Sequence, residues 1–236
     1  MRYAQNRIIV LACLLALSTL AVARPKDEKN EEESRVENSG KVMREILGVP
    51  DDIPQELLDH ARCVVVMPSV LKAAFVVGGS YGRGVMVCRT GKEYRGRWGA
   101  PAMFALEGAS FGLQLGGEAT DFVFLVMNDR GANSLIHSKV KLGADASAAA
   151  GPVGRSAEAD TDAYMRTEIL SYSRARGAFA GISLEGSTLR PDKGANRKLY
   201  GDDRPTPEII AASDSSAPPA AHELIRTLQK ASPELR

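Results

Sequence analysis

The sequence has few of the residues that mark several large classes of protein. Its 236 residues include only six Phe, six Tyr and one Trp, which argues against the aromatic stacking platforms that hold single-stranded nucleic acid. Thirty Lys and Arg nearly balance 29 Asp and Glu, and the formal net charge is +1. No overall positive field therefore attracts nucleic acid, and an anionic ligand must be met by a local group of cations.

Motifs of metal and nucleotide sites are missing as well. The three histidines share no metal-ligand spacing. The glycine-rich run Gly78–Gly84 is not followed by the Gly-Lys-Ser/Thr of a phosphate-binding loop, and Val85–Cys88 continues as a strand where a dinucleotide-binding fold would begin a helix. We therefore expect no metal and no cofactor, and we interpret Gly78–Gly84 as a tight turn or bulge between two strands.

One hydrolase-like motif is present. Gly108–Gly112 matches the pattern Gly-x-Ser-x-Gly, with Ser110 in the position of the nucleophile. In hydrolases that serine lies at a sharp turn from strand to helix, whereas Ser110 is followed by residues that alternate as in a strand. A hydrolase that acts through Ser110 is therefore the last of our three hypotheses, and we expect no catalytic residue.

The N-terminus has the pattern of a secretory signal peptide. The apolar run Ile8–Leu20 is about 13 residues long, too short for a membrane-spanning helix of about 20. It follows a basic start and precedes a small-residue cleavage site that ends at Ala23. We therefore expect residues 1–23 to be removed and the protein to be periplasmic or secreted. We prefer this to a lipoprotein anchored through Cys13, because only five apolar residues precede that cysteine.

Removal of the signal peptide leaves two cysteines, Cys63 and Cys88. In an oxidising compartment they could form one disulfide, worth roughly 3 kcal/mol through loop entropy. Alternatively, each is a buried thiol within an apolar strand. We slightly favour the buried thiols, because both runs already have the composition of a core.

The rest of the pattern predicts an α+β fold with a mostly antiparallel, sandwich-like or barrel-like core. Residues 24–34 read as a flexible leader, 35–201 as the folded domain, and 202–236 as a disordered tail with one helical pattern at 222–230. Helices are expected at 35–47, 53–62, 128–138 and 192–200. Turn signals separate six short strand-like runs: Val64–Met67, Ala73–Val77, Val85–Cys88, Ala102–Leu106, Ser110–Leu115 and Phe122–Met127.

The stretch from Lys139 to Gly186 combines a tract of small residues with the pattern of a hairpin. Its two strands, 168–174 and 178–186, are expected to meet at Arg176-Gly177. Such small residues indicate that backbones approach one another closely there.

Five motifs resemble, in order, those of the SYLF domain, a lipid-binding family: Pro68–Ala73, Gly78–Gly84, Gly116–Asp121, Lys141–Ser147 and Ile169–Gly177. The resemblance spans about residues 35–201. It implies binding of phospholipid or phosphoinositide without catalysis. In eukaryotic members an amphipathic N-terminal helix helps to engage the membrane, and some members bind actin. Here helix 35–47 has only a thin apolar stripe, and export would separate the chain from actin and phosphoinositides.

Our leading hypothesis is therefore non-enzymatic binding of anionic phospholipid at the cell envelope. Each Lys or Arg near an anionic membrane contributes about 1 kcal/mol. The alternative is a structural envelope protein that uses the same surface for a protein partner. The candidate lipid-binding residues are the cations near strand edges and hairpin tips: Lys72, Arg83, Lys139, Lys141, Arg155, Arg174 and Arg176.

Overall fold

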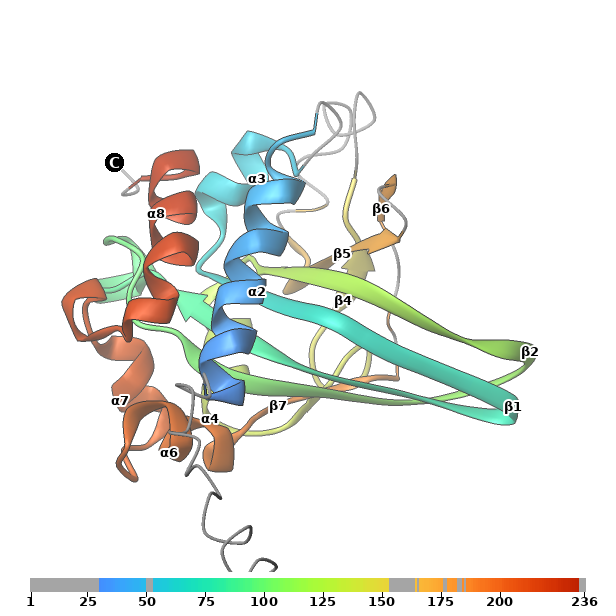
Figure 1. The fold of residues 1–236 in the computed structure, drawn as a ribbon. Coiled ribbons are helices and arrows are strands. Elements are labelled where there is room, and N and C mark those ends of the chain that lie inside the picture. Colours follow the sequence, from blue (N-terminus) through green and yellow to red (C-terminus); the bar gives the residue numbers. More distant parts are fainter. Residues whose placement is uncertain are drawn as a thin grey trace, which may run out of the picture.

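The structure is a computed structural model. It describes residues 30–49, 53–152, 164, 166–175, 178–181, 184 and 186–233, with the backbone alone at 72–78, 109–118, 175 and 178–181. In this part of the chain, seven strands form one mostly antiparallel sheet, and most of the helices gather around one end of it (Figure 1). The predicted α+β class with an antiparallel core is confirmed.

Two long strands, β1 (Cys63–Cys88) and β2 (Ala102–Val126), dominate the sheet. They pair antiparallel over almost their whole length, starting with Cys63 opposite Val126. Together they make a two-stranded ribbon, which is folded in half so that its middle projects away from the helices (Figure 1).

Because the ribbon bends back on itself, the two ends of β1 lie close together. The Cα atoms of Cys63 and Cys88 lie 3.9 Å apart. The bend lies midway along β1, where the pairing with β2 becomes irregular between Ala74 and Val76. Each strand therefore has two limbs, one on either side of the bend.

The six short strands predicted from the sequence are thus wrong in number, because they merge into two long ones. The glycines mark contacts between limbs where we expected turns. A Cβ atom at Gly82 would lie 2.5 Å from Cγ2 of Val70, and one at Gly84 would lie 1.9 Å from the carbonyl oxygen of Val66. Our interpretation of Gly78–Gly84 as a turn or bulge is therefore also wrong.

The other strands extend the two limbs of β2. β5 pairs with the second half of β2 and also contacts β4 and β6, while β7 pairs with the first half and carries β3 on its far side. The antiparallel pairing of β5 with β6 confirms the predicted hairpin. The bounds are β3 (Val140–Lys141), β4 (Ala148–Ala150), β5 (Ile169–Ala175), β6 (Ala178–Gly181) and β7 (Thr188–Pro191).

Helices cover both faces of the sheet at its base. One apolar cluster joins one face to α2, α3 and α8, and a second joins the other face to α4 and α7. Successive strand residues face opposite ways, so the continuous apolar run Cys63–Met67 is buried in both clusters. The helices are α2 (Glu31–Ile46), α3 (Gln55–His60), α4 (Asp129–His137), α6 (Lys193–Tyr200), α7 (Thr206–Ala211) and α8 (His222–Ala231), with short 3-10 turns at Lys92–Tyr94, Asp214–Ser216 and Pro219–Ala221.

Side-chain caps fix the start of two helices predicted from the sequence. The amide oxygen of Asn128 accepts a hydrogen bond from the N–H of Gly131 at the start of α4. The carboxylate of Asp192 accepts one from the N–H of Ala195 at the start of α6. Such caps satisfy amide groups that have no partner within the helix.

The C-terminal region is folded, so the prediction of a disordered tail at 202–236 is wrong for the described residues, while the helical pattern expected at 222–230 is confirmed as α8. Leu224 and Leu228 of α8 are fully buried in the cluster that contains α2, and the two helices lie side by side (Figure 1). The predicted leader 24–34 is also too long, since α2 begins at Glu31. The predicted signal peptide lies outside the described residues.

The end of α8 is held by two buried side chains that follow β1. The guanidinium of Arg89 donates hydrogen bonds to the carbonyl oxygens of Ser232 and Pro233, the latter at 2.6 Å. The indole of Trp98 donates to the carbonyl of Ser232 at 2.8 Å and lies 4.3 Å from the guanidinium carbon of Arg89. Burial lowers the pKa of Arg89 to about 10, so it remains charged at neutral pH and suits the negative end of a helix.

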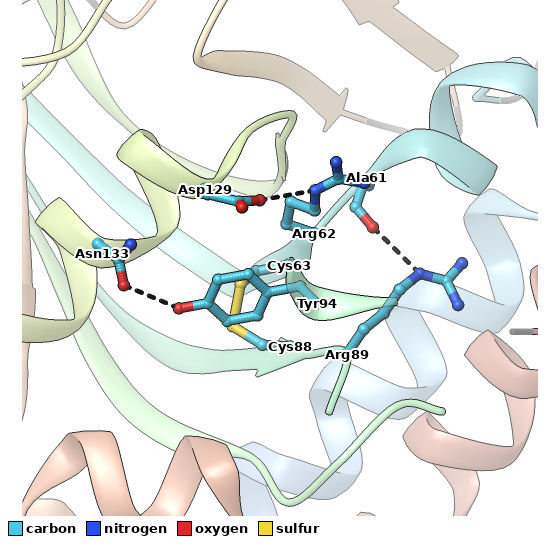
Figure 2. Close-up of a disulfide and its surroundings, with 8 residues drawn as sticks. All are labelled: Ala61, Arg62, Cys63, Cys88, Arg89, Tyr94, Asp129 and Asn133. Atoms are coloured by element: carbon cyan, nitrogen blue, oxygen red, sulfur yellow. Dashed lines mark hydrogen bonds and ion pairs between the residues drawn. A yellow bond between two sulfur atoms is a disulfide. The ribbon is translucent and has the colours of Figure 1, made fainter. Parts of the chain in front are cut away.

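Cys63 and Cys88 form a disulfide, the alternative that we had favoured less (Figure 2). Both are fully buried. The bond links the two ends of β1 across 25 residues, a loop for which chain entropy predicts a contribution of about 3 kcal/mol. Next to it, Arg62 forms an ion pair with Asp129 at 2.9 Å. The disulfide therefore locks the ribbon in its folded form.

Candidate functional site

The ribbon has an uncharged stretch that includes the bend. This stretch, which we call the ribbon tip, consists of residues 73–82 of β1 and 108–117 of β2. None of these 20 residues is charged, and seven are glycine. In the described part of the chain, the two segments pair only with each other. Figure 1 shows that they form the end of the molecule farthest from α7 and α8. A projecting, charge-free surface of this kind is typical of a contact site.

Two large apolar side chains are exposed at this end of the molecule. Leu71, next to the ribbon tip, is 62% exposed, and Tyr81, within it, is 50% exposed. They are the exposed large hydrophobic residues among the side chains that the structure describes. Burying a full leucine side chain stabilises a folded protein by about 1.5–3 kcal/mol. Two large apolar side chains left in water therefore contribute little of this free energy to folding.

The two exposed side chains lie on different limbs of β1. Val70 and Gly82 contact each other across the fold of the ribbon. Neighbouring residues of a strand point to opposite faces, so Leu71 and Tyr81 face outward, one from each limb. The ribbon therefore offers an apolar group on both of its outer faces.

Charged residues border the ribbon tip on both limbs, and Lys72 and Glu118 are closer to the bend along the strands than Tyr81 is. Lys72 stands opposite Glu118 in the register, and Tyr81 stands opposite Glu107. The carboxylate of Glu107 is paired with Arg190 at 2.5 Å, and this hydrogen bond raises the pKa of Arg190. The negative charge of Glu107 is thus largely neutralised.

One predicted cation is level with Tyr81 along the ribbon. The pairing of four strands places Tyr81, Glu107, Thr188 and Lys141 in one row. With strands about 4.8 Å apart, Lys141 lies about 14 Å from Tyr81 in this row. Its side chain is exposed and forms no ion pair with any described residue.

Four of the seven predicted cations have described side chains, and the structure does not gather these four into one surface. Arg83 is paired with Asp192 at 2.8 Å and with the buried Glu32 at 3.6 Å, and Arg174 is paired with Glu45. These two guanidinium groups are already committed to partners within the domain. Lys139 and Lys141 are exposed beside each other near β3. Only the backbone of Lys72 is described, and Arg155 and Arg176 lie outside the described residues.

Helix α2 is not available as an amphipathic membrane helix in this structure. Its apolar residues Val36, Val42, Met43 and Ile46 are buried against the sheet and α8. The apolar face of α2 is therefore part of the hydrophobic core.

The other sequence candidates have no site built around them. Ser110 lies inside strand β2, opposite Gly78, and not at the strand-to-helix turn of a hydrolase. Over the described residues, there is no group of three or more His, Cys, Asp or Glu that could hold a metal ion. The helices described here are also all too short or too polar to span a membrane.

Sequence reasoning missed Leu71, Tyr81 and the ribbon tip. A usable signal was present, because no charged residue occurs between Lys72 and Arg83, or between Glu107 and Glu118. The two uncharged intervals form one uncharged region only because β1 pairs with β2 and places them side by side. The sequence alone does not show this pairing.

Comparison with known proteins finds one matching family model and several relatives. Residues 107–231 match the Ysc84 family model, described as "Las17-binding protein actin regulator". The chain is 37% identical to Protein YSC84 of Saccharomyces cerevisiae over 205 residues, which are 83% of this chain and 43% of that protein. It is 37% identical to LAS seventeen-binding protein 3 of the same yeast over 188 residues, 78% of this chain and 40% of that protein.

A human relative is similar over the same extent. The chain is 31% identical to SH3 domain-containing YSC84-like protein 1 of Homo sapiens over 202 residues, which are 83% of this chain and 58% of that protein. The matches thus cover about half the length of these relatives, one of which is named as a binding protein. The family model also extends through α7 and α8, beyond the limit of 201 that we predicted. The chain belongs to the Ysc84, or SYLF, family.

Proposed function

We propose that this domain binds the surface of phospholipid membranes without catalysis, and that the ribbon tip is the part that enters the bilayer. The observation that carries the proposal is the uncharged ribbon tip at the projecting end of the ribbon, with Leu71 and Tyr81 exposed on the two outer faces of the ribbon there. The SYLF family membership supports a lipid ligand through the resemblance described above.

The two side chains provide enough free energy for measurable binding. Transfer of the exposed parts of Leu71 and Tyr81 into an apolar environment is worth about 1–2 kcal/mol each. Together they contribute roughly 3 kcal/mol, so the membrane partition coefficient is about 100-fold higher than it would be without these two side chains. An apolar contribution of this kind is insensitive to salt.

The depth of insertion is limited by the backbone. Each strand of the ribbon tip has one neighbour in the described part of the chain, so its other edge carries unpaired N–H and C=O groups. Such groups cost several kcal/mol each in the hydrocarbon core. The tip therefore enters to about the depth of the head-group boundary, roughly 5–10 Å.

Of the predicted cations whose backbone the structure describes, Lys72 and Lys141 are best placed for lipid phosphates, because one borders the ribbon tip and the other lies level with Tyr81. Each would add about 1 kcal/mol on an anionic membrane. The preference for anionic lipid is thus moderate and weakens with salt.

We also propose that the protein acts outside the reducing cytosol. The Cys63–Cys88 disulfide supports this, since such bonds persist mainly in oxidising compartments. The signal-peptide pattern of residues 1–23 points to the same location.

Cosedimentation with phospholipid vesicles tests the proposal. Residues 24–236 are mixed with vesicles of phosphatidylcholine, with and without phosphatidylglycerol, at low and at high salt. We expect binding to both kinds of vesicle, tighter with phosphatidylglycerol by about 30-fold at low salt, with a smaller difference at high salt. Failure to sediment with either vesicle at either salt concentration would contradict the proposal.

A further inference from the structure

At the end of the molecule away from the ribbon tip, helix α8 separates two hollows. One, of about 680 Å³, lies between α8 and the loops around Arg97 and Asp214. The other, of about 710 Å³, lies between α8, α2 and α3. Both are lined by Arg226 and Lys230. These two side chains thus stand on the ridge between the hollows.

Arg226 and Lys230 are free to bind a ligand. Both are exposed, and neither forms an ion pair with any described residue. With His222 they occupy positions four residues apart along one face of α8. The other cations here are partly neutralised, since Arg44 pairs with Glu223 and Arg97 pairs with Asp214 at 3.6 Å. The surface therefore keeps an excess of positive charge.

The floors of the hollows are partly apolar. Ile225 contributes to the first hollow and Leu47 and Ala231 to the second. Helix α8 has 10 residues and is about 15 Å long, so the hollows extend over several residues of a bound chain. Each is much larger than a single phosphate group. Cations above an apolar floor fit a short polypeptide with alternating acidic and apolar side chains.

We infer that the α8 face is a docking surface for an acidic, partly apolar segment of a protein partner. Charge complementarity to Arg226 and Lys230 selects an acidic segment, and the hollows on either side receive its apolar side chains. Because α8 and the ribbon tip lie at opposite ends of the molecule (Figure 1), one flat membrane cannot contact both. The partner can therefore bind while the tip is occupied, and the inference does not depend on the proposed lipid function.

Fluorescence anisotropy with a labelled peptide of alternating Glu and Leu tests this inference. The chain should bind it, and should bind the peptide with Gln in place of Glu at least tenfold more weakly. The double variant Arg226→Ala/Lys230→Ala should lose about tenfold or more in affinity for the acidic peptide, since two charge-assisted contacts are removed. Glu223→Gln should instead tighten binding a few-fold, because it frees Arg44.

The matched control is Lys139→Ala/Lys141→Ala, which removes the same net charge from another exposed surface. It should leave peptide binding within about twofold of the parent, as expected for charges beyond the screening length. Equal losses in the two double variants would overturn the inference, as would equal affinity for the Glu and Gln peptides. Loss of vesicle binding in Arg226→Ala/Lys230→Ala without loss of peptide binding would assign the α8 face to membranes and would also overturn it.

Discussion

Replacing Leu71 and Tyr81 together by serine should weaken binding to phospholipid vesicles by roughly 30-fold to several hundred-fold. Leu71 is 62% exposed and Tyr81 is 50% exposed, so replacing them should leave the fold intact. The expected loss equals the transfer free energy of the two apolar groups, about 1–2 kcal/mol each. Cosedimentation titrations of parent and variant against the same vesicles measure it.

The same assay separates this effect from a general loss of binding. The control Arg226→Ser/Lys230→Ser changes two exposed residues of α8, at the other end of the molecule (Figure 1), and should bind vesicles within about twofold of the parent. The difference in vesicle affinity between the parent and Leu71→Ser/Tyr81→Ser should be the same at low and high salt, because the lost contribution is apolar and is not screened. A Leu71→Ser/Tyr81→Ser variant that binds as tightly as the parent would show that the ribbon tip is not the membrane contact.

Gly84→Ala should lower the free energy of unfolding by about 3 kcal/mol or more, or prevent stable folding. The new Cβ atom would lie 1.9 Å from the carbonyl oxygen of Val66 and 2.8 Å from the Cα atom of Met67. These are backbone atoms of the facing limb of β1, so the clash cannot be relieved by a side-chain rotation. The limbs would have to separate, which would disturb the buried clusters on both faces of the sheet.

Gly79→Ala is the matched control, because it lies in the same strand. The nearest atom to its added Cβ is the carbonyl oxygen of Gly108 at 3.6 Å, an ordinary contact. Its stability should stay within about 0.5 kcal/mol of the parent. Urea unfolding followed by the fluorescence of Trp98, the single tryptophan and a fully buried one, compares the two variants. Similar midpoints for both would argue against close packing of the limbs.

Local signals in the sequence were sufficient for the helices that carry their own caps. Asn128 and Asp192 each bond an amide within three residues, so the start of α4 and of α6 could be predicted from short patterns. The β5–β6 hairpin was predictable for the same reason, since its partners are neighbours in the chain.

The long strands could not be predicted in this way, because glycine occurs for two different structural reasons that the sequence does not distinguish. It marks turns, but it also permits close approach of two backbones. Gly82 and Gly84 serve the second purpose, and their contacts with Val70 and Val66 arise only when β1 folds back on itself. The helical pattern at 222–230 was recognised, but the burial of this helix was missed, because it depends on α2, about 180 residues earlier in the chain.

The candidate lipid-binding cations show the same limit. Arg83 has the composition and position expected of a ligand contact, but its partner Asp192 is 109 residues away. Whether a cation is free depends on tertiary neighbours that the local sequence does not reveal. The absence of charge in the ribbon tip was a better guide, because a missing charge cannot be neutralised by folding.

The most direct test of the central claim is the environment of a dye placed beside the ribbon tip. Ala119→Cys puts a thiol opposite Leu71 on an exposed position, while Cys63 and Cys88 remain in their disulfide. With an NBD label at residue 119 of the 24–236 chain, adding phosphatidylcholine–phosphatidylglycerol vesicles should shift the emission to the blue and increase it. The same label on Lys230→Cys should not respond. An unchanged emission at residue 119 in vesicle-bound protein, or a response only at residue 230, would contradict the account.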